Sequence, residues 1–248
     1  VISLLREHGD DARVIAGGHS LIPLMKLRMA EVPHLIDLQN ITELFGIDVG
    51  SKIRIGAMAT QSDIINDSSL ASAAPILKEA SLQIADPQIR YMGTVGGNVA
   101  NGDPGNDMPG LMQCLDASFV LRGPDGEREV KARDFYQGAY MTEREDDEVL
   151  VAVNFDAPKG GYAYEKQKRK IGDYATAAAA VIITRDGSVC KRASIAMTNL
   201  SDTPVFCKDA SNSLVGTSLT ADDIKKAVNG MIEAIDPVSY THLTLPTI

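Results

Sequence analysis

Two stretches of sequence decide the fold, Ala16-Gly17-Gly18-His19-Ser20 and, further along the chain, Thr94-Val95-Gly96-Gly97-Asn98. Glycine has no Cβ, so the main chain can take a positive φ and approach a ligand closely, and successive bare N–H groups form an anion-binding concavity. Either pair alone is equally consistent with a tight turn. Together they predict two loops that enclose one pyrophosphate.

The first glycine pair lies between a strand and a helix. Residues 13–16 are expected to form a short strand, residues 20–29 a helix with Pro23 in its first turn, and residues 34–38 a second strand. In such a β-loop-α-β unit the N–H groups of the loop and the dipole of the helix favour a phosphate. The position of the pair therefore strengthens the nucleotide hypothesis.

The second glycine pair is expected to lie in a loop. Apolar spacing predicts a helix over residues 70–85, which Asp86-Pro87 ends. Residues 90–110 are so rich in Gly, Asn, Asp and Pro that a long loop is predicted, and a long loop in a compact domain is usually functional. A short buried helix should follow over residues 108–115, with Asp107 as its N-cap.

The remaining patterns predict an α+β protein in three parts. Strands are expected at 52–56, 118–122, 128–131, 149–155, 162–164, 177–184 and 193–197. Capping boxes, Thr60 with Asp63 and Thr220 with Asp223, should each begin a helix. The expected domains are residues 1–50, 51–157 and 158–237, with both ends of the natural chain cut and a non-native tail at 238–248.

Composition excludes several classes of function. The net charge of −9 argues against a general nucleic-acid binder. No apolar run approaches the roughly 18 residues that span a bilayer, and no signal peptide is apparent, so a cytoplasmic protein without membrane insertion is expected. The three cysteines and four histidines show no metal-ligand spacing, which predicts neither a metal site nor a disulfide framework.

Residues 16–26, 85–98 and 162–174 together resemble the FAD-binding medium subunits of aerobic carbon monoxide dehydrogenases, in the molybdenum hydroxylase family. The resemblance covers Val1 to Pro237. It implies the FAD-binding fold shared with vanillyl-alcohol oxidase and p-cresol methylhydroxylase, in which two α/β subdomains hold FAD between them and a C-terminal α+β domain follows.

The resemblance also implies a set of FAD-binding residues. The two glycine stretches would wrap the pyrophosphate, Asp107 would contact the flavin nucleotide, and Tyr174 would lie against the isoalloxazine ring. A lysine within residues 166–170 would approach the flavin; Lys166 is chosen, although the alignment also permits Lys168. Asp107 is alternatively only a helix cap, His19 a solvent-facing residue and Tyr174 an ordinary core tyrosine.

The implied function is electron transfer, with no catalytic residue in this chain. A large molybdopterin subunit would oxidise the substrate and a small subunit with two [2Fe-2S] clusters would relay electrons to FAD, which reduces a quinone or similar acceptor. The complex would be a heterohexamer in the cytoplasm or at the inner face of the membrane. The alternatives are the FAD subunit of another molybdenum hydroxylase (for xanthine, nicotinate or an aromatic acyl-CoA), an autonomous flavin oxidase, and a non-enzymatic nucleotide-binding module.

Overall fold

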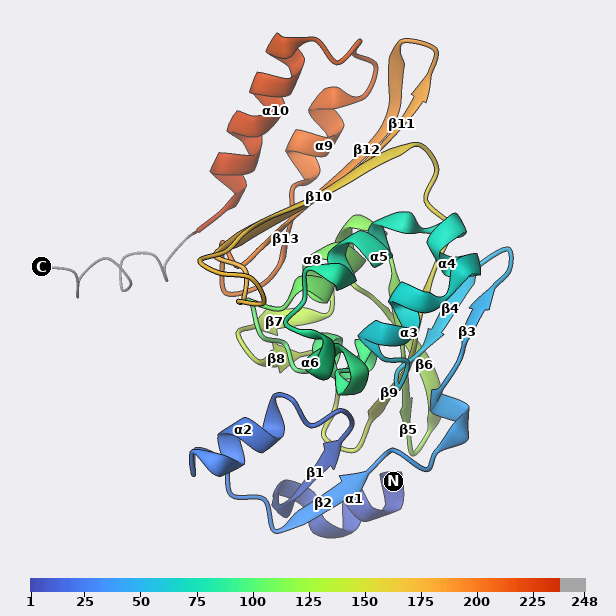
Figure 1. The fold of residues 1–248 in the computed structure, drawn as a ribbon, viewed down its shortest axis with the longest axis vertical. Coiled ribbons are helices and arrows are strands. Elements are labelled where there is room, and N and C mark those ends of the chain that lie inside the picture. Colours follow the sequence, from blue (N-terminus) through green and yellow to red (C-terminus); the bar gives the residue numbers. More distant parts are fainter. Residues whose placement is uncertain (237–248) are drawn as a thin grey trace, which may run out of the picture.

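A computed structural model describes residues 1–236 (Figure 1), and the expected non-native tail at 238–248 lies outside this range. The N-terminal part contains α1 (Ile2–His8), a 3-10 turn (Gly9–Asp11), β1 (Ala12–Ile15), α2 (Leu21–Lys26) and β2 (His34–Asp37). The predicted β-loop-α-β unit is confirmed, since β1 and β2 pair in parallel with Val14 opposite Ile36. Helix α2 is shorter than expected, and Arg28, just beyond it, has a positive φ of 57°.

The central part is built on an antiparallel sheet with the strand order β3-β4-β9-β5-β6. The strands are β3 (Ile47–Val49), β4 (Ile53–Gly56), β5 (Ser118–Gly123), β6 (Gly126–Lys131) and β9 (Val149–Phe155). A 3-10 turn (Thr42–Leu44) leads into β3, and β7 (Tyr136–Gly138) pairs with β8 (Met141–Thr142). The hairpin and strand predicted over 118–131 and 149–155 are confirmed, and Phe119 and Val153 are fully buried partners in adjacent strands.

Six short helices, α3 to α8, accompany this sheet (Figure 1). They are α3 (Gln61–Asn66), α4 (Ser68–Ala73), α5 (Pro75–Leu82), α6 (Pro87–Met92), α7 (Val95–Ala100) and α8 (Asp107–Cys114). The capping box of Thr60 with Asp63 is confirmed at the start of α3. The buried faces of all of these helices except α6 join the sheet in one apolar core.

Three predictions for this region were wrong. The helix expected over 70–85 is interrupted at Ala74 (φ −144°), because the residue before Pro75 is driven out of the helical region. The long loop expected over 90–110 contains the end of α6 and all of α7. Asp107 is the first residue of α8 and not its cap; Asn106 is the N-cap residue.

The C-terminal part is a four-stranded antiparallel sheet covered by two helices. Its elements are β10 (Gly161–Gln167), β11 (Ala177–Asp186), β12 (Val189–Thr198), β13 (Val205–Phe206), α9 (Lys208–Leu214) and α10 (Ala221–Ala234). The predicted capping box of Thr220 with Asp223 begins α10. Alternate residues of β11 face opposite sides: Ala180 joins the central core, whereas Val181 packs in the cluster with α9 and α10. Within residues 1–236, no helix is long and apolar enough to cross a membrane.

Candidate functional site

A cavity of about 490 Å³ opens where the three parts of the chain meet. Twelve of the thirteen predicted site residues line it: Ala16, Gly17, Gly18, His19, Ser20, Thr94, Gly96, Gly97, Asn98, Asp107, Lys166 and Tyr174. The exception is Val95, whose side chain is buried in the central core. The structure therefore brings together residues that three distant segments of the sequence supply.

The first glycine loop exposes its backbone N–H groups as predicted. Within residues 1–236, the amides of residues 17–20 donate to no acceptor, and the Ser20 hydroxyl makes no hydrogen bond. Gly18 has a φ of +74°, a backbone conformation that would be strained in a residue with a side chain. A Cβ on Gly17 would lie 2.0 Å from the carbonyl oxygen of Met92, so this loop packs directly on the backbone at the end of α6. The N–H groups of residues 17–20 are therefore unpaired hydrogen-bond donors in the lining of the cavity.

The second glycine pair behaves differently, and the prediction that it bares its amides was wrong. The N–H of Val95 donates to the Ala59 carbonyl (2.8 Å), and that of Gly96 to the Ala57 carbonyl (2.9 Å). The next two amides, of Gly97 and Asn98, donate to the side-chain hydroxyl and the carbonyl of Thr94, both at 3.0 Å. All four N–H groups are therefore used, two to attach α7 to residues 57–59 and two to form the first turn of the helix.

The two glycines of this pair allow α7 to approach the chain that follows β4. A Cβ on Gly96 would lie 2.5 Å from the Cβ of Ala57 and 2.7 Å from its carbonyl oxygen, which is too close for any side chain. Gly97 is exposed at the cavity, and the Asn98 side chain accepts the N–H of Met108 (3.3 Å) at the start of α8. The close packing of Gly96 on Ala57 thus positions α7, whose residues Gly97 and Asn98 line the cavity.

A buried ion pair joins the start of α8 to β10 in the lining of the cavity. The Lys166 Nζ lies 2.9 Å from the Asp107 Oδ2, and the two side chains are 1% and 6% exposed. The Tyr164 hydroxyl donates to the other oxygen, Oδ1. Burial raises the pKa of Asp107, and the neighbouring Lys166 ammonium and Tyr164 hydroxyl partly offset this by stabilising the carboxylate. With one donor on each oxygen, the geometry fits an ionised carboxylate.

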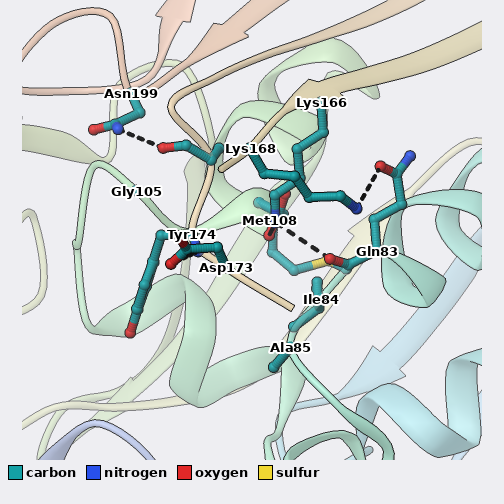
Figure 2. Close-up of polar contacts among 12 residues, drawn as sticks. Gln83, Ile84, Ala85, Gly105, Met108, Lys166, Lys168, Asp173, Tyr174 and Asn199 are labelled. Carbon is teal, nitrogen blue, oxygen red and sulfur yellow. Dashed lines mark hydrogen bonds and ion pairs between the residues drawn. The ribbon is translucent and has the colours of Figure 1, made fainter. Parts of the chain in front are cut away.

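Gln83, just after α5, contacts both of the lysines between which the sequence left a choice (Figure 2). Its backbone carbonyl accepts from Lys166 and its side-chain Oε1 from Lys168, both at 3.3 Å. Its Nε2 donates to the Tyr164 carbonyl (3.4 Å), which attaches α5 to β10. Lys166 lines the cavity, whereas Lys168 does not.

Tyr174 belongs to the segment that connects β10 with β11. Its side chain extends beside the loop that carries Gly105 (Figure 2), and a Cβ on Gly105 would lie 3.3 Å from the Tyr174 Cδ1. The residue is 58% exposed, so the alternative of a core tyrosine is wrong. Partial burial, with Asp103 and Asp107 nearby, raises the pKa of its phenol, which is therefore neutral at physiological pH.

The cavity also includes residues that the sequence did not indicate. Among them are Arg13, Ile84, Asn101, Tyr140 and Arg144. Tyr140 has a positive φ of 61°, unusual for a tyrosine, and its N–H donates to the Gly102 carbonyl (2.8 Å). No motif marks these positions, because distant segments reach the cavity only in the folded chain.

Other chemistry has little support in the described residues. No group of three or more His, Cys, Asp or Glu within 1–236 could hold a metal ion. All three cysteines are buried and unpaired, and burial raises the thiol pKa of Cys114 to about 12 and of Cys207 to about 11. These thiols are protonated near neutral pH and are poor nucleophiles.

The donor set fits FAD, the cofactor expected from the sequence. The free amides of residues 17–20 and the Ser20 hydroxyl can donate to phosphate oxygens. Elsewhere in the lining, Lys166 supplies a cation and Tyr174 an aromatic face. A cavity of several hundred cubic ångströms with a few polar groups at its ends is typical of a cofactor site.

Comparisons with known proteins agree with this fit. Residues 1–158 match the family described as the FAD binding domain in molybdopterin dehydrogenase, and residues 162–243 match the CO dehydrogenase flavoprotein C-terminal domain. The chain is 56% identical over 237 residues to the carbon monoxide dehydrogenase medium chain of Afipia carboxidovorans, covering 94% of this chain and 82% of that one. The carbon monoxide dehydrogenase medium chain of Hydrogenophaga pseudoflava is 44% identical, and the alignment covers 95% of this chain and 83% of that one.

A solved structure gives the same result in three dimensions. A chain in the crystal structure of the Cu,Mo-CO dehydrogenase superimposes with a TM-score of 0.93 at 55% identity, covering 95% of this chain and 84% of that chain. The α+β class and the membership of the molybdenum hydroxylase FAD-subunit family, both expected from the sequence, are confirmed.

Proposed function

This chain belongs to the FAD-binding family of the molybdopterin dehydrogenases, and we propose that it carries electrons from iron–sulfur clusters through FAD to a quinone-type acceptor. It is an oxidoreductase subunit of the aerobic carbon monoxide dehydrogenase type, and FAD is its cofactor. The observation that supports the electron-transfer role most strongly is that the free amides of residues 17–20 and the buried Lys166 line the same cavity.

In this proposal each wall has a distinct task. The amides of residues 17–20 bind the pyrophosphate, while Thr94 and residues 96–98 shape the wall beside it. Asp107 accepts from a hydroxyl of the nucleotide, and Tyr174 covers one face of the flavin and excludes water. Exposed His19 borders the phosphates.

Bound FAD supplies the redox chemistry, since it can take up electrons and release them again. Lys166 would contribute a fixed positive charge at the wall of the cavity, and a cation near the pyrimidine end of a flavin favours the anionic reduced form. The chain thus provides binding, orientation and electrostatics.

The proposal extends to the assembly. The chain is part of a dehydrogenase complex of the Cu,Mo type. We propose a molybdopterin-containing large subunit and a small subunit with two [2Fe-2S] clusters as its partners, in a heterohexamer located in the cytoplasm or at the inner membrane face. Three unpaired cysteines support a reducing compartment.

The domains within the chain are proposed as residues 1–50, 51–157 and 158–237.

The test is to purify the assembled complex and to record its visible spectrum before and after the substrate is added. We expect flavin absorption at about 450 nm that bleaches with substrate and returns when a quinone is added. A complex without flavin, or a bound flavin that the substrate cannot reduce, would contradict the proposed function.

A further inference from the structure

Tyr164 lies behind the cavity wall and has no direct access to the cavity. It is 1% exposed and does not line the cavity, but its hydroxyl donates to the Asp107 Oδ1. Tyr164 and Lys166 are two residues apart on β10, so their side chains lie on the same face of the strand. Both donors therefore reach Asp107 from the same strand.

The burial of this group makes the second donor important. A buried ion pair is maintained only if hydrogen bonds satisfy the remaining lone pairs, because both charges have lost their water. Lys166 occupies one carboxylate oxygen at 2.9 Å, which leaves the other to Tyr164. The other ionisable groups facing Asp107 are Lys168 and Tyr174, and neither forms a hydrogen bond with it in the described chain.

We propose that Tyr164 is a positioning residue of the FAD site, whose hydroxyl keeps the buried Asp107 carboxylate ionised and so holds the Lys166 ammonium at the cavity wall. This inference rests on the proposed FAD function. Tyr164 itself does not reach the cavity, so it acts only through the ion pair.

The role predicts a specific pH dependence. Without the Tyr164 hydroxyl the carboxylate loses a stabilising donor, so the pKa of Asp107, already raised by burial, rises further. As the pH falls, Asp107 is then protonated earlier and leaves Lys166 without its counter-ion. FAD affinity should consequently be lost at a higher pH than in the unaltered protein.

The test compares Tyr164→Phe with Tyr136→Phe in the complete complex. Tyr136 is the control, because it is a partly buried tyrosine whose ring packs on Phe119 and Phe135 and whose hydroxyl donates to a neutral group, the Val99 carbonyl (3.3 Å). The affinity for added FAD is measured by quenching of flavin fluorescence from acid to neutral pH. We expect the pH at which half of the FAD affinity is lost to move up by about one unit in Tyr164→Phe, which is the effect of one hydrogen bond to a charged group. In Tyr136→Phe this midpoint should stay unchanged.

A second variant gives the opposite sign and preserves the shape of the side chain. Site-specific replacement of Tyr164 by 3,5-difluorotyrosine makes the phenol a stronger donor, so the midpoint should move to lower pH. If Tyr164→Phe fails to assemble, the direction of this shift decides the question. An unmoved midpoint with the fluorinated residue, or equal shifts in Tyr164→Phe and Tyr136→Phe, would overturn the inference. An unaltered complex that binds no FAD would overturn the proposed function itself.

Discussion

Lys166 and Lys168 show how the fold separates two residues that the sequence treats alike. Both ammonium groups lie 3.3 Å from an oxygen of Gln83, but only Lys166 is paired with buried Asp107 and lines the cavity. We predict that Lys166→Met weakens FAD binding at least about tenfold. It should also cost about 3–5 kcal/mol of stability, as expected when one partner of a buried pair is removed.

Lys168→Met is the matched control for this residue-scale prediction. It removes the same charge and one contact to Gln83, and we expect FAD affinity to stay within about twofold, since a partly exposed charge contributes little. Fluorescence titration with FAD measures affinity, and denaturant unfolding measures stability. Equal effects of the two substitutions on FAD affinity would contradict the assignment of Lys166.

At the scale of elements, α7 shows that one motif can have two uses. The first glycine pair precedes a helix and leaves its amides free, whereas the second begins a helix whose amides bond to the Ala57 and Ala59 carbonyls. We predict that Gly96→Ala destabilises the chain by about 3 kcal/mol, at the upper end of overpacking, because the new Cβ would meet the backbone of Ala57.

Gly161→Ala is the control for the α7 prediction. Gly161 begins β10, and a Cβ there would meet no atom within 4 Å, so we expect a change within about 0.5 kcal/mol. Thermal or denaturant unfolding of both variants without FAD measures the difference. If Gly96→Ala left stability unchanged while abolishing FAD binding, the second pair would be a phosphate loop and not a packing element.

For the whole molecule, the sequence predicted most of the cavity but not the use of each group in it. Periodicity and turn chemistry placed β1, β9 and the β5–β6 hairpin, since these signals are local. The free or bonded state of an amide depends on a partner far away in the sequence, as Gly96 and Ala57 show. Val95 was assigned to the site as part of a contiguous motif, whereas the helical turn directs its side chain into the core.

Other groups in the cavity carry no sequence signal. Nothing in the sequence separates Tyr164 from other strand tyrosines, and only the fold brings its hydroxyl to Asp107 at the start of α8. Tyr140 reaches the cavity through a backbone conformation that no motif predicts. The α+β class and the residues near the glycine pairs that line the cavity were accessible from sequence, while the tertiary pairing of charges was not.

Hydrogen–deuterium exchange of the complex, with and without FAD, tests the central claim that one cavity holds FAD through the first glycine loop. We predict that peptides containing residues 17–20 exchange quickly without FAD and gain strong protection when it binds, because their N–H groups have no acceptor in the described chain. Peptides containing residues 95–98 should be protected in both states, since their amides are already bonded. Saturating FAD that leaves residues 17–20 unprotected, or that protects only residues 95–98, would contradict the account.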